Sequence, residues 1–475
     1  MSKNPKKLSA KADFGRRLSK IPRLTAYYKK DKKMTKKLLS AFLCAIVLFL
    51  STSLISCNFS FAEKEPMPEK QSLYQAVESA SSEASYKYVS QYLARWGFTY
   101  YSSTKLTLVE DKFHKYYVEE LPSTYELALA VAYDFLDNSY DTIDLTDMTA
   151  TTTAIVDAYV AAVGDKYAFY RTPEEYDDYN QDMSGEFCGI GVTIEYSYIE
   201  GTMLINSVMR DSPAERAGIL PGDYIVGVDG KTIGELGYQG IIDSIKGIEG
   251  TPVAVTLKRG DEEITLTAIR AKIAEQSVYY EMLEDNIGYI QISSFKDNTA
   301  SQFGEALDFV RENGALGVIF DLRSNGGGYL HAALAMLEYL VPEGVVMTSY
   351  TFNGINYVEK TKNPDKLDIP CVVLCNQYSA SAAELFTSAI RDYGEMGLLD
   401  ECIVGTVSYG KGIMQTTFGF TDGSSITMTI AYYYTPLGEN FHGEGITPDT
   451  LVENAGASDV QLATATIELL AKIAN

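Results

Sequence analysis

The sequence predicts a multidomain α+β protein with three kinds of segment in order along the chain. Helix-type spacing of apolar residues dominates 73–183, short strands with two helical stretches fill 186–272, and strands alternate with helices from 281 onward. A chain of 475 residues exceeds one ordinary core, and its contents of 46% apolar and 22% charged residues are those of globular proteins. We therefore expect a helical N-terminal region, a small β-rich domain and an α/β core.

The charge of the chain is unevenly distributed. Residues 1–37 hold 14 of the 40 lysines and arginines but only 2 of the 63 acidic residues, while the net charge of the whole chain is −23. The remainder is therefore strongly acidic and should repel nucleic acids and anionic lipids. We predict no nucleic-acid partner and interpret the basic stretch as a local targeting signal.

An uncharged apolar run, LLSAFLCAIVLFLSTSLI, occupies residues 38–55 and is long enough for a membrane span or a signal-peptide core. The tetrapeptide that ends at Cys57 resembles the lipobox of bacterial lipoproteins, whose cysteine is acylated. Translation from Met34 would give this segment a short basic front. The alternative is an uncleaved anchor with its basic side in the cytoplasm. Both interpretations predict a membrane-anchored body in the bacterial cell envelope, outside the cytoplasmic membrane.

The remaining cysteines predict neither a disulfide nor a metal site. There is no C-x-x-C pair and no metal-ligand spacing. Cys371 and Cys375 would share one face of a strand, but four residues of strand hold them too far apart to bridge. We expect buried thiols and no metal or cofactor.

The helical region follows a polar, proline-containing tether at 58–72. LALAVAYDFLDNS at 127–139 and TATTTAIVDAYVAAVGDKYAFY at 149–170 both place apolar residues at i, i+3 and i+4. Tyrosine is frequent here, and a tyrosine-rich helical face usually serves packing or an interface. We expect this region to be structural.

The small domain begins with EFCGIGVTIEY and continues with AGILPGDYIVGVDG. Its first turn resembles the carboxylate loop of PDZ domains. The resemblance implies that Gly189, Ile190, Gly191 and Val192 receive a terminal carboxylate, and that the next strand offers an edge to a bound peptide. A PDZ domain that serves only as a gate or packing module remains open, since a fold does not fix a function.

The α/β part predicts a mostly parallel sheet. Strands at 287–292, 318–320 and 371–375 are each followed by a helical pattern. Sites in such sheets lie at the carboxyl ends of the strands. The glycines of Asn325–Gly328, at one such end, let a backbone approach a ligand. A phosphate loop is disfavoured because its Gly-Lys-Ser/Thr ending is missing.

Residues 376–415 hold the most chemically suggestive pattern. Ser379 and Ser381 follow a strand and precede a helix, where the first helical amides are unpaired and can stabilise an oxyanion. A serine nucleophile needs a base, and Lys411, between two glycines, can act as one if its amine is desolvated. Alternatively, Ser381 caps a helix and Lys411 is a solvated surface residue.

Histidine offers no obvious base. The chain has three histidines, and none has a placement that suggests this role: His114, His331 and His442. Asp321 and Asp392 are interpreted as structural partners of Arg323 and Arg391.

Four motifs, FDLRSNGGG, SASAAEL, RDYG and SYGKGIMQ, together resemble the carboxy-terminal processing proteases, which are serine peptidases with a Ser–Lys dyad and a built-in PDZ domain. The resemblance covers roughly 165–449. It implies a crotonase-like α/β protease core, Ser381 as nucleophile, Lys411 as base and Gln415 as its support. The oxyanion donors would be Ala382 and either Gly327 or Gly328.

Two features depart from the family pattern. EMGLLDECIVG lies in a longer connection before Lys411, and Ala383 stands where serine is usual. Extra residues there can be absorbed outside the site. At i+4 in a strand-like segment, Gln415 would share a face with Lys411 and accept a hydrogen bond from its amine.

The prediction is a serine endopeptidase that cleaves at or near the C-terminus of extracytoplasmic proteins, with the PDZ domain presenting an unstructured substrate tail. The helical region also admits a homodimer, as in the family. The alternatives are an inactive PDZ-containing peptide-binding scaffold and, more remotely, a non-peptidase enzyme. The predicted domains are a basic extension with the signal or anchor segment, tether and helical region, PDZ domain, protease core and C-terminal helix, at 1–57, 58–185, 186–272, 273–450 and 451–475.

Overall fold

The structure is a computed structural model that describes residues 75, 100–122, 124–139, 141–144, 147–197, 202–351, 354, 356–364, 366–454 and 458–474. The predicted basic stretch, the apolar run and Cys57 lie outside these residues. No helix in the described part is long and apolar enough to cross a membrane. The chain divides into two compact units: Met1–Tyr176, Thr351–Ile355 and Met414–Ala431 form the first, and Asp177–Tyr350, Asn356–Ile413 and Tyr432–Asn475 form the second.

The first unit is built on three helices of the described chain, α5 (Tyr100–Tyr116), α6 (Thr124–Asn138) and α7 (Met148–Val163). The carboxylate of Asp147 accepts hydrogen bonds from the amides of Thr149 and Ala150 and so caps α7. Gly164, at φ 83°, ends it. The predicted apolar spacing packs inward as one core, which includes Val109, Phe113, Leu127, Val131, Ile155 and Tyr159.

Strands distant in sequence complete this unit. β1 (Phe169–Arg171) pairs antiparallel with β18 (Ser425–Tyr434), which also pairs with β17 (Ile413–Gly419). The carboxylate of Asp165 accepts hydrogen bonds from the amide and hydroxyl of Thr429. Residues 414–431, which the sequence places in the 273–450 segment, therefore cluster with the N-terminal helices.

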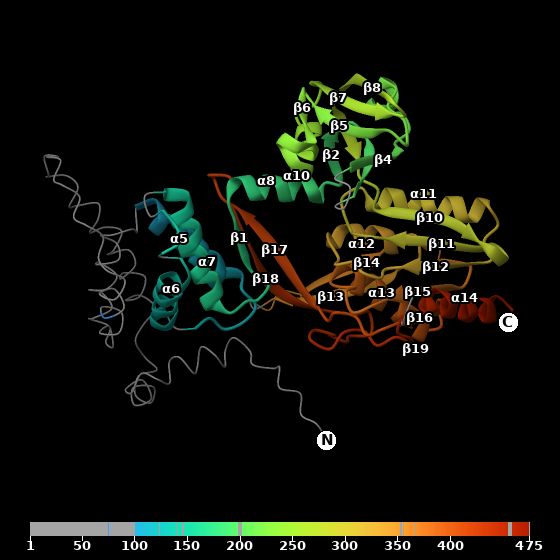
Figure 1. The fold of residues 1–475 in the computed structure, drawn as a ribbon. Coiled ribbons are helices and arrows are strands. Elements are labelled where there is room, and N and C mark those ends of the chain that lie inside the picture. Colours follow the sequence, from blue (N-terminus) through green and yellow to red (C-terminus); the bar gives the residue numbers. More distant parts are fainter. Residues whose placement is uncertain are drawn as a thin grey trace, which may run out of the picture. The chain divides into compact units, whose positions relative to one another are not determined.

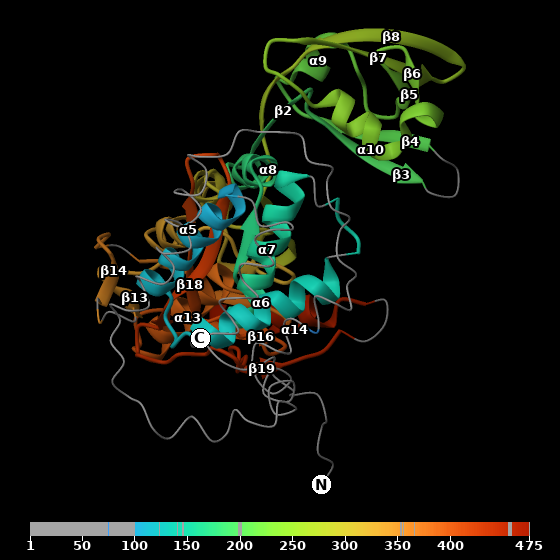
Figure 2. The ribbon, with the colours of Figure 1, turned by 90° about the vertical axis from the view of Figure 1, so that its left-hand side faces the viewer.

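Residues 186–274 of the second unit fold as a small β-rich domain. β2 (Glu186–Gly189) pairs with β9 (Ala271–Ala274). A separate sheet has the order β3 (Val192–Ser197), β4 (Thr202–Val208), β5 (Tyr224–Val228), β7 (Pro252–Arg259) and β8 (Glu262–Ile269), with β6 (Lys231–Thr232) beside β5. The helices are α9 (Pro213–Ala217) and α10 (Ile233–Ile245), and Figure 2 shows this domain from a second side. β3 is an edge strand, as the sequence predicts.

Both chain connections to this domain are held at one place, which we call the stem. The amide of Glu275 donates to the carbonyl oxygen of Gly185 at 2.6 Å, just outside β2 and β9. The ammonium of Lys296 bridges Asp182, at the end of α8 (Pro173–Met183), and the carboxylate of Glu275, at 2.8 and 2.7 Å. The side-chain amide of Asn298 donates to Gly185 as well, so the core grips both connections.

The α/β core contains a six-stranded sheet in the order β10 (Val278–Leu283), β11 (Ile287–Ile292), β12 (Gly317–Asp321), β15 (Cys371–Cys375), β16 (Glu401–Gly405) and β19 (Thr450–Leu451) (Figure 1). Only β10 and β11 pair antiparallel in this sheet. The other core elements are η2 (Glu284–Asn286), α11 (Thr299–Glu312), α12 (Leu330–Leu337), β13 (Gly344–Thr351), β14 (Asn356–Thr361), α13 (Ala382–Glu395) and α14 (Val460–Ile473). The predicted mostly parallel sheet is confirmed.

Each face of this sheet packs against its own helices. Ile319 and Leu374 belong to one cluster with Leu469 of α14. Phe320, one residue on, faces the other way, and its ring lies 5.6 Å from Phe303 of α11 and 5.9 Å from Phe386 of α13. This alternation explains why the central strands are apolar throughout.

Candidate active site

Three loops meet at the carboxyl ends of adjacent parallel strands. They follow β12, β15 and β16 and span 322–329, 376–381 and 406–412. The longer connection before Lys411 contains β16, and the third loop begins where this strand ends. That strand pairs with β15 and brings the lysine loop beside the serine loop.

Ser381 occupies a constrained backbone conformation, at φ 58° and ψ −116°, immediately before α13. A side chain other than glycine rarely adopts a positive φ, and such residues cluster at functional sites. The amide of Ser381 donates to Oε2 of Glu384 at 2.8 Å. The serine therefore stands on the sharp strand-to-helix turn that the sequence predicts.

Ser379, the competing nucleophile, is engaged in the fold. It is 1% exposed. Its hydroxyl donates to the carbonyl oxygen of Leu322 at 2.8 Å and accepts from the amide of Asn376 at 2.9 Å. These bonds join the ends of β12 and β15, so they favour a structural role for Ser379.

The carboxylate of Glu384 connects the serine and lysine loops. Oε2 accepts hydrogen bonds from the amides of Ser381 and Lys411, at 2.8 and 2.7 Å. Oε1 accepts from the hydroxyl of Ser408 and the amide of Gly410, at 2.5 and 2.6 Å. Two predicted catalytic residues thus lie against one oxygen atom of a fully buried side chain.

Tyr433 makes a second connection between the same two residues. Its hydroxyl lies 3.1 Å from the carbonyl oxygens of both Ser381 and Lys411. The side chain is 4% exposed. Burial, and secondarily the charge of Glu384, raises the pKa of the phenol well above its usual value. We call the two side chains the Glu384–Tyr433 bracket.

Neither Glu384 nor Tyr433 is among the predicted site residues. A signal for Glu384 was available, because glutamate three residues after a serine at a helix start is the capping-box pattern. Tyr433 lies far along the chain on β18, in a run of three tyrosines. No spacing rule distinguishes it from its neighbours.

The glycine loop lies directly against the nucleophile. A Cβ at Gly327, whose φ is 100°, would be 2.8 Å from Cβ of Ser381 and 3.0 Å from the amide nitrogen of Ala382. The amide of Gly327 itself donates to Oδ1 of Asn325 at 2.8 Å. The amides of Gly328 and Ala382 have no acceptor within the described residues. Of the two glycines predicted as oxyanion donors, Gly328 has the available amide.

Gln415 lies on β17, and its side-chain nitrogen donates to the carbonyl oxygen of Tyr167 at 2.6 Å. Lys411 precedes that strand, so the shared strand face expected for these two residues does not apply. The oxygen Oε1 is the atom that a bond from the lysine amine requires. That bond stays a prediction.

Each of the three histidines has a contact with a residue other than Glu384 and Tyr433. His331 pairs with Asp297 at 2.7 Å on the surface, and Nδ1 of His114 lies 2.8 Å from the carbonyl oxygen of Glu110. The ring of His442 packs edge-on against Tyr432.

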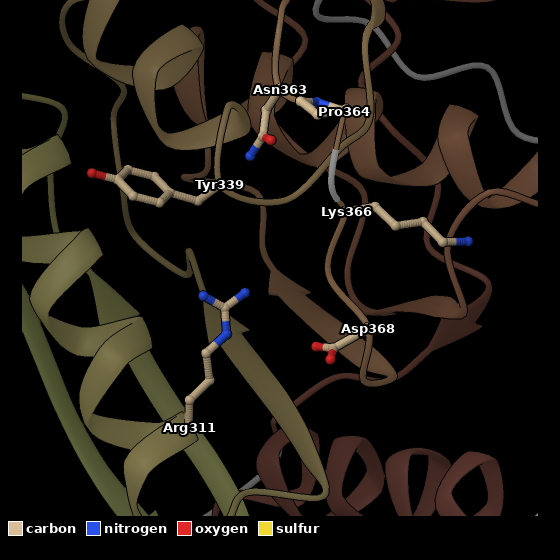
Figure 3. Close-up of a pocket in the computed structure, with 6 residues that line it drawn as sticks. All are labelled: Arg311, Tyr339, Asn363, Pro364, Lys366 and Asp368. Atoms are coloured by element: carbon tan, nitrogen blue, oxygen red, sulfur yellow. The ribbon is translucent and has the colours of Figure 1, made fainter.

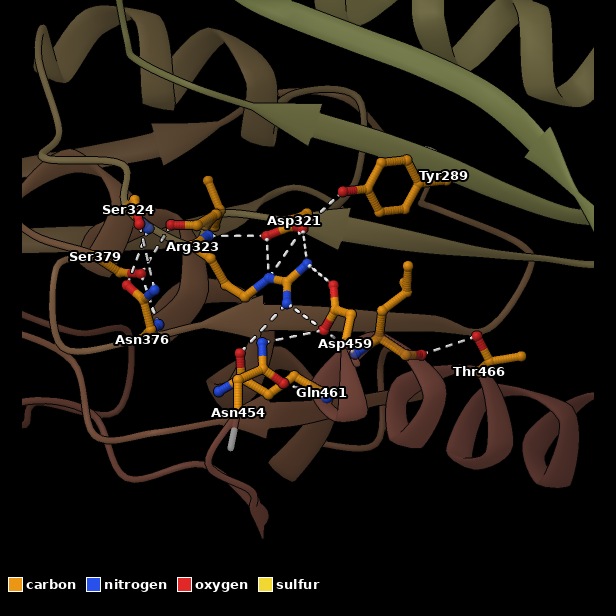
Figure 4. Close-up of polar contacts among 12 residues, drawn as sticks. Tyr289, Asp321, Arg323, Ser324, Asn376, Ser379, Asn454, Asp459, Gln461 and Thr466 are labelled. Carbon is orange, nitrogen blue, oxygen red and sulfur yellow. Dashed lines mark hydrogen bonds and ion pairs between the residues drawn. The ribbon is translucent and has the colours of Figure 1, made fainter. Parts of the chain in front are cut away.

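Arg323 anchors the chain just before the glycine loop (Figure 4). Its guanidinium contacts Asp321 at the end of β12 and Asp459, the cap of α14, at 2.6 and 2.7 Å. The hydrogen bond from Arg323 lowers the pKa of Asp459 to about 2. The predicted pairing of Asp321 with Arg323 is therefore confirmed. The predicted pairing of Asp392 with Arg391 is confirmed by a contact of 2.8 Å between their side chains.

In the carboxylate loop of the small domain, two backbone carbonyl oxygens accept hydrogen bonds, whereas the amides of the same residues can still donate to a ligand. The carbonyl oxygens of Ile190 and Gly191 accept from the amides of Ala214 and Met209, at 2.8 and 3.0 Å. Their own amides have no acceptor in the described part of the chain. Gly191 has φ 78°, and a Cβ there would be 2.6 Å from Cβ of Ser212, so glycine is required. Gly189 and Val192 flank these residues at the ends of β2 and β3.

A separate surface pocket of about 630 Å³ contains none of the predicted site residues (Figure 3). Its lining residues come from the ends of α11 and α12 and from the loop before β15: Arg311, Tyr339, Asn363, Pro364, Lys366 and Asp368. Nor do the described residues contain a group of three or more histidines, cysteines, aspartates or glutamates that could hold a metal ion.

Comparison with known proteins identifies the family of the chain. The model of peptidase family S41 matches residues 286–452, and a PDZ domain model matches 204–259. The carboxy-terminal processing protease CtpA of Bacillus subtilis (strain 168) is 34% identical over 329 residues, which are 68% of this chain and 69% of that protein. The chain belongs to peptidase family S41. The predicted family and fold class of this S41 member are confirmed.

Other relatives match a smaller part of their own length. A probable CtpA-like serine protease of Staphylococcus haemolyticus (strain JCSC1435) is 36% identical over 302 residues, or 63% of this S41 chain and 59% of that protein. The chain thus spans about three fifths of that relative. The solved photosystem II D1 C-terminal processing protease is 24% identical, with a TM-score of 0.44, and covers 74% of this chain and 93% of its own.

Proposed function

We propose that this chain is a serine endopeptidase that cleaves at or near the C-terminus of extracytoplasmic proteins with a Ser381–Lys411 dyad. The observation that carries the proposal is the convergence of both residues on one carboxylate oxygen of Glu384. The backbone amides of residues thirty positions apart in sequence donate to the same oxygen atom, which brings the two backbones together. A nucleophile and its base require this proximity.

In the proposed reaction, neutral Lys411 accepts the hydroxyl proton of Ser381 while the serine oxygen attacks the peptide carbonyl. The amides of Gly328 and Ala382 donate to the tetrahedral oxyanion, each contributing about 3 kcal/mol. The protonated lysine gives its proton to the leaving amine, and the acyl-enzyme forms. Water, deprotonated by Lys411, then hydrolyses the ester. Oε1 of Gln415 orients the lysine amine.

The PDZ domain would capture the substrate tail. The available amides of Ile190 and Gly191 suit a terminal carboxylate, and the peptide would add to the free edge of β3. Val192, Ile194 and Tyr196 of β3 are partly buried against the domain core. We therefore assign tail binding, rather than packing alone, to this domain.

Residues 38–57 support a location outside the cytoplasmic membrane, with the chain attached through that segment. Mass spectrometry of the mature N-terminus tests this location. An acylated Cys57 supports lipoprotein processing. An unmodified N-terminus that begins before residue 38 supports an uncleaved anchor.

The dyad is tested by Ser381→Ala and Lys411→Ala. Each should lower cleavage of an unfolded protein with a free C-terminal tail by at least about 10³-fold, because a dyad acts as a unit. A fluorophosphonate should label the peptide that contains Ser381 in the unaltered protein only.

Matched controls are Ser301→Ala and Lys362→Ala, which alter exposed residues of the same kinds and should leave cleavage unchanged. Cleavage that persists in Ser381→Ala contradicts the proposed nucleophile. A folded, tail-binding protein without cleavage would instead indicate a scaffold.

A further inference from the structure

A second side chain holds the two proposed catalytic residues at a fixed spacing, and it acts on their carbonyl groups. Tyr433 has one hydroxyl proton and two acceptors at equal distance, the carbonyl oxygens of Ser381 and Lys411, both at 3.1 Å. Hydrogen bonds that share one proton in this way become weaker if either loop moves. The hydroxyl therefore favours one separation of the two backbones.

The ring of Tyr433 is itself fixed. It is 4% exposed and lies 5.5 Å from the ring of Phe441 in an edge-on arrangement. The backbone is tied to the lysine loop as well, because the amide of Tyr433 donates to the carbonyl oxygen of Gly412 at 3.3 Å. The side-chain amide of Asn440 donates to the carbonyl oxygens of both Gly412 and Tyr433. The hydroxyl cannot follow a displaced loop.

We propose that Tyr433 is a positioning residue of the peptidase: its hydroxyl sets the distance between the backbone of the nucleophile and that of the base. This inference rests on the proposed dyad. Glu384 holds the amides of the two residues, and Tyr433 holds their carbonyls, so each residue is gripped on both sides. Without the hydroxyl, the 406–412 loop keeps its hydrogen bonds to the carboxylate of Glu384 but can rotate about them.

The test is Tyr433→Phe, with Tyr434→Phe as the matched control on the same strand. Phenylalanine retains the ring and its packing against Phe441 and removes only the hydroxyl group that donates to both carbonyl oxygens. A displacement of about 1 Å in a catalytic group costs on the order of 100-fold in rate. We expect kcat and the rate of fluorophosphonate labelling at Ser381 to fall about 10- to 100-fold, with KM within about twofold by the same argument.

The pH dependence separates positioning from structural support. In the proposed mechanism Lys411 acts as a neutral amine, and a looser loop that admits water to this amine favours its ammonium form. The acidic limb of the labelling rate should therefore move to higher pH in Tyr433→Phe and stay in place in Tyr434→Phe. Amide hydrogen exchange should become faster in the 376–381 and 406–412 loops of Tyr433→Phe alone.

Two outcomes would overturn the proposal, and a third would overturn the proposed function on which it rests. Labelling and kcat within about twofold of the unaltered protein would remove the positioning role. Activity that falls only in step with lost folded protein, with the pH limb unmoved, would make Tyr433 a structural residue. If the unaltered protein is not labelled at Ser381, the proposed function fails, whereas the exchange measurement still decides whether the hydroxyl couples the loops.

Discussion

At the scale of single residues, Glu384 shows how one buried carboxylate can organise a site. It accepts four hydrogen bonds, and it has no exposed surface through which water could replace them. A carboxylate can only accept, which matches four donors pointing at it. All four donors are backbone amides or a hydroxyl, and one of the amides is that of Lys411.

Glu384→Gln is expected to disrupt this arrangement. The amide nitrogen of glutamine is a donor, and at either position it would face two other donors. We predict a loss of about 2 kcal/mol or more in the free energy of unfolding and a fall in kcat of about 100-fold as the loops separate. Urea unfolding and single-turnover cleavage measure these effects. Glu395→Gln, on an exposed part of the same helix, is the control. An active, equally stable Glu384→Gln protein would refute the bracket.

Ser381 and Lys411, which carry the proposed chemistry, were predictable from the sequence. Of the two side chains that hold them, Glu384 has a capping-box signal in the sequence and Tyr433 has none. Ser381 and Lys411 stand in short motifs with unusual neighbours. Tyr433 acts through a hydroxyl that spans two loops, and this depends on strand order rather than local spacing. The Gly327 amide illustrates the same limit, since its bond to Asn325 follows from the loop conformation.

At the scale of elements, α14 is tied to the glycine loop through Arg323. This guanidinium contacts Asp321, which is 1% exposed, and the helix cap Asp459. Asp321 also accepts a hydrogen bond from the hydroxyl of Tyr289 at 2.7 Å. The C-terminal helix thus stabilises the strand end from which the glycine loop departs.

Arg323→Met should therefore destabilise the core although it touches no proposed catalytic residue. Removal of one partner from a largely buried ion pair leaves Asp321 uncompensated, at a cost of about 3 kcal/mol. Guanidinium chloride unfolding of the second unit measures the change. Arg210→Met, at an ion pair exposed on both sides, should produce no measurable change. Equal midpoints for both variants would contradict the assigned role.

The helices and some strands of the core follow from local pattern, because each central strand is an uninterrupted apolar run. Five strands were not predicted, namely β10, β13, β14, β16 and β19, and β16 matters most because it precedes the lysine loop. Its residues Glu401–Gly405 lie in the connection that appeared only as a longer loop before Lys411. Glu401 and Gly405 bound only three apolar residues, a run too short to distinguish a strand from a loop.

At the scale of the whole molecule, stability should depend on pH through buried carboxyl groups. Burial raises the pKa of Glu110 and Glu401 to about 7 and that of Asp157 to about 6, with nearby acidic groups adding to it. Oε2 of Glu401 is buried without a partner in the described residues. In each case the folded state binds a proton more tightly than the unfolded state.

The sign follows from that difference. The contribution of a raised carboxyl pKa is fully present below the unfolded value, about 4.5 for glutamate, and is lost as pH rises to about 7. The lowered pKa of Asp459 acts oppositely, since its contribution is lost as pH falls from about 4 to about 2. We predict that the thermal midpoint is highest near pH 4 to 5 and declines towards pH 8.

Glu401→Gln tests how much of the pH dependence of stability in the second unit comes from the raised pKa of Glu401. It should flatten the decline between pH 5 and pH 8 and raise stability at pH 8 by up to about 2 kcal/mol, after allowance for partial exposure. Calorimetry at several pH values measures this. Glu453→Gln, at an exposed position, should leave the slope unchanged. A slope identical in both variants would rule out Glu401 as its source.

The stem has a consequence for how this family member can be altered. The chain leaves the α/β core and returns to it within one hydrogen bond, between Glu275 and Gly185, and Lys296 clasps the two ends together. For the core, the residues between these ends form a closed insertion, and the free-energy cost of such an insertion depends only weakly on its length. A graft of another recognition cassette onto the same two ends would leave the sheet and its three loops in register.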